Sequence, residues 1–148
     1  SGPETKSMEE SIYRVRLLCD YEQWWRYNIF MTVVEYDVGN RQTGYRNFID
    51  RVYDVDDGSD DRTAPEGYTN DRGAEITTGP CHRIEIYLYV IANTFPSSVV
   101  IRDSPPFQAR LVVERDGQPA VDRLWDVNQW GGLTLVGFPV GGPDLPGV

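Results

Sequence analysis

The pattern in residues 82–92, HRIEIYLYVIA, constrains the fold of this chain more than any other feature. Ile84, Ile86, Leu88 and Val90 alternate with charged residues and tyrosines. A period of two places successive side chains on opposite faces of an extended strand, so one face is apolar and the other is polar or aromatic. The pattern predicts a β-strand whose four aliphatic side chains belong to the core.

Further segments carry strand patterns. Residues 12–19 alternate apolar side chains with arginines, and residues 27–36 are rich in β-branched and aromatic side chains. For the first segment, a capping box of Ser7 and Glu10 that begins a helix is the alternative. The strands expected further along the chain are 99–101, 107–115, 119–125 and 133–138, with a hairpin turn at Asp116-Gly117.

Residues 45–53 have a different period. Their apolar side chains fall at i, i+3, i+4, i+7 and i+8, from Tyr45 to Tyr53, which is the pattern of one helix face. Thr43 precedes them as a candidate cap. The sequence therefore predicts an antiparallel β-sandwich of seven or eight strands with one short helix and a long acidic loop.

The domain organisation follows from length and local composition. A chain of 148 residues is long enough for one well-formed core. Residues 1–10 read as a leader that is foreign up to Ser7, because the sole lysine, Lys6, lies just before Met8; the alternative is that the whole N-terminus is native. We expect a single β-sandwich domain over 11–138 and, over 139–148, a tail too rich in Pro and Gly for a core.

Charge and apolar run length exclude several classes of function. A net charge of −9 disfavours binding to nucleic acid, whose phosphates attract Lys and Arg. No apolar run approaches the roughly 20 residues of a membrane-spanning helix. With Met8 as the native start the protein is expected to be cytoplasmic, and periplasmic or extracellular if the leader replaces a removed signal peptide. Two cysteines, Cys19 and Cys81, are expected to be free thiols.

The acidity is concentrated in one segment. Five aspartates fall between Asp54 and Asp61, and residues 56–75 hold seven acidic residues but two arginines. Blocks of like charge are usually exposed interaction segments, and a loop of this length is usually functional or disordered. The residues expected to bind a partner with a basic surface are Asp56, Asp57, Asp60, Asp61, Glu66 and Asp71.

The same aspartates raise the question of calcium. Ca²⁺ prefers six to eight oxygen ligands, but the EF-hand spacing fails, because Pro65 stands where that loop needs a glutamate. The stretch VYDVDDGSDD resembles the third calcium loop of C2 domains, and this resemblance implies metal ligands at Asp54, Asp56 and Asp60. In C2 domains these aspartates follow a strand, whereas here a helix is expected before them. We expect no cofactor, with calcium as the alternative.

Motifs of catalysis are absent from the sequence. His82 is the one histidine, and the chain contains no P-loop, GxGxxG or GxSxG pattern. We therefore expect no enzymatic activity. The aromatic residues that could form an exposed platform for sugars are Trp24, Trp25, Trp125 and Trp130, with Tyr87 and Tyr89. Adjacent tryptophans on a strand point to opposite faces, so at least one of Trp24 and Trp25 should be buried. The candidate platform residues are Trp24, Trp25 and Trp130.

Together these observations predict a non-catalytic protein–protein interaction module that uses its acidic loop against a basic partner. Immunity proteins and secretion-system accessory proteins have this character, which is an analogy and not a family assignment. The alternative function is a calcium-dependent carbohydrate- or lipid-binding β-sandwich that uses the same loop.

The effect of calcium on the melting temperature distinguishes these two functions. A cation site would stabilise the folded protein by roughly 2.7 kcal/mol when calcium is a hundredfold above its Kd. Because the EF-hand spacing fails, we expect millimolar calcium to leave the melting temperature nearly unchanged in a calorimetric scan. A rise of several degrees that is lost in Asp54→Asn or Asp56→Asn would instead support the calcium-dependent function.

Overall fold

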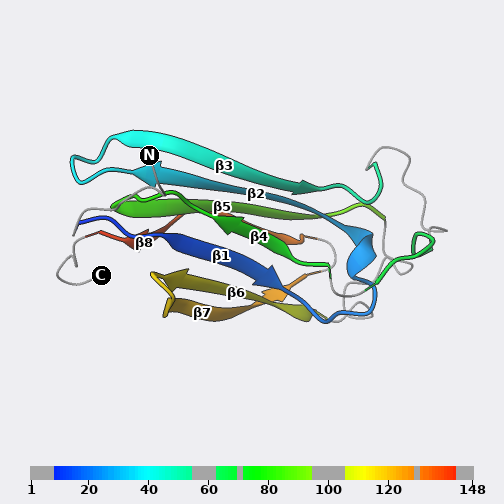
Figure 1. Ribbon diagram of the computed structural model, residues 1–148. Helices are drawn as coiled ribbons and strands as arrows, with labels where there is room; N and C mark the ends of the chain where they lie inside the picture. Colours follow the sequence, from blue (N-terminus) through cyan, green and yellow to red (C-terminus); the bar gives the residue numbers. More distant parts are fainter. Residues whose placement is uncertain (1–8, 55–62, 70–71, 95–105, 129–130, 143–148) are drawn as a thin grey trace.

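The computed structural model describes residues 9–54, 63–69, 72–94, 106–128 and 131–142. These residues form eight strands and a single 3-10 turn, η1 (Trp24–Arg26), arranged as two packed layers (Figure 1). This confirms the predicted antiparallel β-sandwich. The strands are β1 (Tyr13–Leu18), β2 (Tyr27–Tyr36), β3 (Gln42–Asp50), β4 (Ala74–Thr77), β5 (Arg83–Ala92), β6 (Phe107–Arg115), β7 (Gln118–Val127) and β8 (Leu133–Gly141).

Each layer is a four-stranded antiparallel sheet. One has the order β4-β1-β6-β7 and the other the order β3-β2-β5-β8. The longest ladder joins β2 to β5, with an unbroken register from Tyr27 opposite Ala92 to Tyr36 opposite Arg83. The expected strands at 12–19, 27–36 and 82–92 are confirmed within a residue or two, and the expected strand at 99–101 lies outside the described residues.

The core lies between the inner faces of the two sheets. Ile84, Ile86 and Leu88 are 0% exposed and Val90 is 1% exposed, which confirms that this face of β5 is buried. The facing sheet contributes the alternate residues of β1 and β6. These inner residues are Tyr13, Val15, Leu17, Ala109, Leu111 and Val113.

The helix expected at 45–53 is wrong, because most of this segment is the edge strand β3. Strand β3 pairs with β2 as a hairpin, so that Tyr45 lies opposite Val34 and Ile49 lies opposite Phe30. Most of its side chains are exposed, so burial does not require apolar residues to alternate along the strand. The helical spacing of the apolar residues was therefore coincidental, and pairing with β2 decided the conformation.

Strand β4 lies in the stretch between Asp56 and Gly79 where no element was expected. Its sequence, AEIT, is too short for a period to be recognised, yet Ala74 and Ile76 are buried against the core. It pairs with β1, and the Arg14 guanidinium on β1 forms an ion pair with the Glu75 carboxylate at 2.6 Å. The long acidic stretch is thus interrupted by a strand at its C-terminal end.

The hairpin signal at Asp116-Gly117 is confirmed. Asp116 has φ 52° and Gly117 has φ 79°, and the two residues join β6 to β7. Positive φ at both central positions is the requirement of a type I′ turn, which matches the twist of the flanking strands. The asparagine or aspartate followed by glycine that such turns prefer is what made this hairpin visible in the sequence.

The predicted start of the tail, at residue 139, is too early in the chain. Strand β8 continues to Gly141 and buries Val140 to 6% exposure. Pro139 is compatible with the strand because β8 is an edge strand, where a missing N–H need not break the ladder. Gly141 has φ 84°, and a Cβ there would collide with the Tyr13 hydroxyl, so the glycine allows the close approach of two chain segments.

No helix among the described residues is both long and apolar enough to span a membrane.

Replacing Ile86 by Ala tests the inner face. We expect the free energy of unfolding in urea to fall by about 2–5 kcal/mol, because the cavity would lie in the centre of the core. Val136→Ala, on the neighbouring strand and 68% exposed, is the matched control and should change it by less than about 0.5 kcal/mol. Equal effects of the two substitutions would contradict the register of β5.

Candidate functional site

The residues expected to bind a partner are placed only in part. Asp56, Asp57, Asp60, Asp61 and Asp71 lie outside the described residues. Glu66 is exposed in the described segment 63–69, which lies at the same end of the sandwich as η1 (Figure 1). The acidic contact surface therefore stays a prediction.

The expected metal ligands are likewise placed only in part. Asp54 is exposed, with its carboxylate 3.8 Å from the Arg51 guanidinium, whereas Asp56 and Asp60 lie outside the described residues. In the part of the chain that the structure describes, no three His, Cys, Asp or Glu side chains gather in a way suited to a metal ion. A strand, β3, does precede Asp54, so the resemblance to the C2 loop no longer conflicts with the local structure. Calcium binding stays the alternative prediction.

Trp24 and Trp25 do not form an exposed platform. They are 1% and 6% exposed, so their expected role in carbohydrate binding is wrong. Both lie in the turn η1 and not on a strand. Adjacent side chains in such a turn need not point to opposite faces of a sheet, so both can be buried. Trp24 packs edge-on against Phe107, with ring centroids 5.8 Å apart. Trp130 lies outside the described residues.

Arg72 holds this end of the sandwich together. Its guanidinium, 8% exposed, forms an ion pair with Asp50 and lies over the Trp24 ring at 5.4 Å. It also donates to the carbonyls of Trp24 at 2.7 Å, Tyr27 at 2.6 Å and Asp50 at 3.2 Å. A planar guanidinium with five N–H groups can satisfy several acceptors at once. Arg72 thereby connects η1, β2 and β3, and most of its donors are already used.

Two shallow depressions flank Arg72, and neither presents reactive chemistry. One, of about 390 Å³, is lined by Cys19, Arg110 and Leu124, among others. The other, of about 450 Å³, is lined by Glu66, Tyr68 and Thr69, among others. Burial raises the pKa of the Cys19 thiol to about 11, so the nucleophilic thiolate is scarce at neutral pH. Cys81 has its pKa raised to about 11 for the same reason, and both cysteines are free, as expected.

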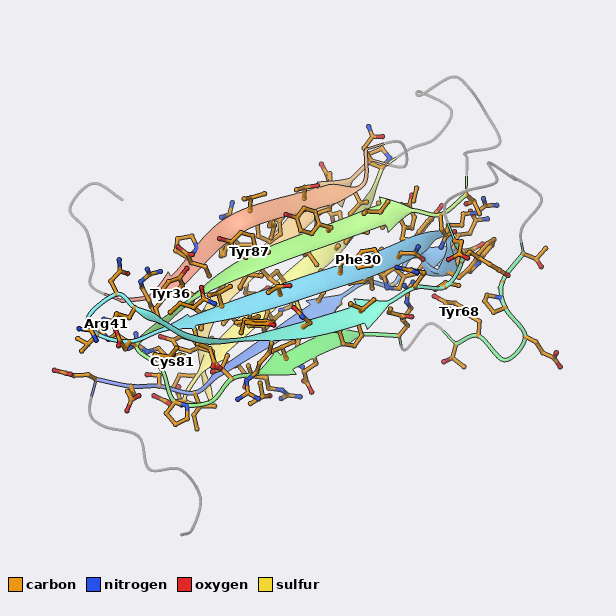
Figure 2. All side chains as sticks on the ribbon, turned by 90° about the horizontal axis from the view of Figure 1, so that it is seen from above. Phe30, Tyr36, Arg41, Tyr68, Cys81 and Tyr87 are labelled. Atoms are coloured by element: carbon orange, nitrogen blue, oxygen red, sulfur yellow. The ribbon has the colours of Figure 1, made fainter. Side chains whose placement is uncertain are left out.

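Sequence reasoning considered Tyr87 and Tyr89 only as part of a sugar platform and missed the outer face of the β3-β2-β5-β8 sheet as a whole, which we call the aromatic face. Figure 2 looks onto this face, with Phe30, Tyr36 and Tyr87 labelled on it. The register places aromatic and aliphatic side chains in rows across the strands. Its members are Phe30, Val34, Tyr36, Tyr45, Ile49, Tyr87, Tyr89, Ile91 and Val136.

Several side chains of the aromatic face are well exposed. Val136 is 68% exposed, Tyr45 63% and Ile49 62%, with Ile91 and Tyr89 at 43% and 37%. Single exposed apolar residues are ordinary on protein surfaces, but a contiguous group on one sheet face is a candidate interaction site.

The charged groups at one end of the aromatic face neutralise one another. The Tyr36 hydroxyl donates to a Glu85 carboxylate oxygen at 2.8 Å, and this bond is the main reason that the pKa of Tyr36 is raised. Arg83 lies 3.9 Å over the Tyr36 ring and 3.3 Å from Glu85. This end therefore presents little net charge.

The outer face of the β4-β1-β6-β7 sheet is different. Arg14 pairs with Glu75 at 2.6 Å, Arg16 with Glu114 at 3.2 Å, and Arg110 with Asp122 through a two-pronged contact. Paired charges of this kind suit a surface that stays in water. The two outer faces of the sandwich thus differ: ion pairs cross this one, whereas exposed aromatic and aliphatic side chains predominate on the aromatic face.

No family model matches the chain, and neither a curated protein nor a solved structure matches it. The function is therefore argued from the geometry of the aromatic face and the acidic segment.

A signal for the aromatic face was present in the sequence. Tyr87 and Tyr89 alternate with the buried residues of the most regular strand, so they had to lie on its outer side. The sequence predicted a helix for Tyr45 and Ile49. That prediction hid the fact that they lie on the same sheet face, opposite Val34 and Phe30.

Arg72→Ala tests the role of the buried guanidinium. We expect the free energy of unfolding to fall by about 3 kcal/mol, since Asp50 loses its counter-charge and three carbonyls lose a donor. Arg110→Ala breaks an exposed Arg–Asp pair and is the matched control, with a change close to the error of urea denaturation. If Arg72→Ala lowers the free energy of unfolding no more than Arg110→Ala does, Arg72 behaves as an ordinary surface residue and the prediction is wrong.

Proposed function

We propose that this protein is a non-catalytic protein-binding β-sandwich. The aromatic face makes the central contact with the partner, and the acidic segment 54–71 contacts a basic region at the edge of that interface. This keeps the interaction role and the basic partner inferred from the sequence, and it moves the main contact from the loop to the sheet.

The observation that carries the proposal is the contrast between the two outer faces. Interface centres are enriched in tyrosine and phenylalanine and depleted in charge. The aromatic face has that composition, whereas the opposite face is crossed by Arg–Glu and Arg–Asp pairs. Tyrosine also contributes contact area at a low cost in side-chain entropy.

The basic character of the partner is inferred from charge complementarity. The chain has a net charge of −9, and Asp54 and Glu66 are exposed in the segments that follow the C-terminal end of β3. Charges at the rim of an interface act mainly by accelerating association. We expect the remaining acidic residues, Asp56, Asp57, Asp60, Asp61 and Asp71, to act in the same way.

The chemistry of the described residues favours binding over catalysis. The thiol groups have raised pKa values, and the guanidinium between the two depressions is engaged in structural contacts. Burial of Trp24 and Trp25 removes two of the three side chains on which a carbohydrate platform depended.

Site-specific photo-crosslinking in the cells that make the protein tests the proposal. A photoreactive amino acid at position 89, on the aromatic face, should crosslink to one predominant protein, which mass spectrometry identifies. The same group at position 124, which is 59% exposed on the other sheet, is the control and should not yield that product. Crosslinks that are absent at both positions, or equal at both, would contradict the proposal.

Binding of the identified partner is then measured by calorimetry. Tyr89→Ser and Val136→Ser should each weaken the affinity by about tenfold or more, because residues near the centre of an interface carry most of the binding energy. Leu124→Ser should stay within about twofold of the parent protein. Raising the salt concentration should slow association if the acidic segment contacts a basic surface, and no slowing would leave the acidic segment without a role.

A further inference from the structure

Among the described residues the two sheets have four edge strands, and these edges differ in how well they are protected against pairing with another strand. The edges are β4 and β7 in one sheet and β3 and β8 in the other. An unpaired edge presents backbone N–H and C=O groups to any other strand, so proteins usually shorten, bend or interrupt such strands.

Three of the four edges carry such protection. Strand β4 is four residues long. Strand β7 begins beside Pro119, where the register with β6 shifts. Strand β8 contains Pro139, and its pairing with β5 is irregular between Ile86 and Leu88. Each of these features opposes the addition of another strand.

Strand β3 carries the least of this protection, because its one register shift with β2, between Glu35 and Tyr36, lies near the beginning of the strand. It is nine residues long, contains no proline, and keeps an unbroken register with β2 from Asp50 to Gly44. Among the described residues no strand pairs with its other edge. Its most exposed large side chains are Tyr45 and Ile49, which are two residues before and two residues after Asn47.

We propose that β3 pairs antiparallel with β3 of a second copy of this chain, across a two-fold axis at Asn47. In this register Tyr45 lies opposite Ile49 of the second copy, and the symmetry repeats this contact. Aromatic residues opposite β-branched residues are among the favourable cross-strand pairs. The two sheets join into one continuous sheet of eight strands.

The occupant is a second copy because the strand is complementary to itself. A two-fold interface needs a surface in which each feature matches another across the axis, and the spacing of Tyr45 and Ile49 about Asn47 meets this condition. Charge does not oppose this register, because Arg46 and Asp50 already form ion pairs within their own chain, with Glu35 and Arg72. In the proposed register the diagonal neighbour of Arg46 is Asp50 of the second copy.

The dimer places two aromatic faces side by side on one sheet. This inference does not depend on the proposed function, because it concerns strand pairing along the edge of the sheet, although Tyr45 and Ile49 also belong to the aromatic face. If both hold, a partner with two contact sites would be held by both copies, which raises its apparent affinity.

Sedimentation velocity and equilibrium on the full chain test the proposal. The parent protein should show a dimer fraction that grows with concentration in a series reaching about 1 mM. Tyr45→Lys and Ile49→Glu should each shift the protein towards monomer, because each replaces an apolar contact by a charge opposite an apolar side chain. Leu124→Lys, on the other sheet, is the control and should dimerise like the parent.

The double variant Tyr45→Lys with Ile49→Glu tests the register. The introduced charges are four residues apart on one strand, but across the two-fold axis opposite charges face each other twice, so dimerisation should recover. Both positions are exposed, and circular dichroism checks that each variant is folded. Amide exchange in β3 should also slow as the parent protein is concentrated.

Three outcomes would overturn the proposal. They are a parent protein that stays monomeric throughout the series, a dimer that neither single variant weakens, and single variants that weaken it without recovery in the double variant. These variants leave Tyr89 and Val136 unchanged, and the proposed function is tested at those two positions. A failure of the dimer proposal can therefore be told apart from a failure of the proposed function.

Discussion

The rest of the structure depends on the ladder between β2 and β5. It joins ten residues of each strand without a shift in register. Because side chains alternate across a strand, burying Ile29, Met31 and Val33 against the opposite sheet leaves Phe30, Thr32 and Val34 on the outer side. The choice of core residues therefore also chooses the surface that the sheet presents. The aromatic face follows from the way in which the core is built.

The two sheets of this fold expose different kinds of side chain on their outer faces. On the β4-β1-β6-β7 sheet, paired arginines and carboxylates are solvated and contribute modestly to stability. On the β3-β2-β5-β8 sheet, exposed tyrosines and aliphatic side chains gain nothing from water, so burying them in a complex is favourable. This difference, and not the presence of a cleft or a reactive group, is the physical basis of the proposed function.

Arg72, which follows the acidic segment in the chain, is a buried cation that anchors the start of the next described segment to the fold. Arg72 follows the acidic residues in the chain and enters the end of the sandwich, where it contacts Asp50 and two carbonyls near η1. These bonds fix the point at which the chain enters β4 after the acidic segment. The composition of the segment indicated a binding surface, but its attachment point was not visible in the sequence.

The sequence by itself determined the class of fold, the inner face of β5, the hairpin at Asp116-Gly117 and the concentration of negative charge, because strict alternation, turn chemistry and composition are local properties. Only the tertiary structure decided that residues 45–50 form an edge strand, that Ala74–Thr77 form a strand, and that Trp24 and Trp25 are buried. Each of these depends on a partner distant in the chain. An edge strand that buries little of either face needs no alternation, and a four-residue strand is too short to show one. The burial of a turn depends on which side chains, such as Phe107, pack over it.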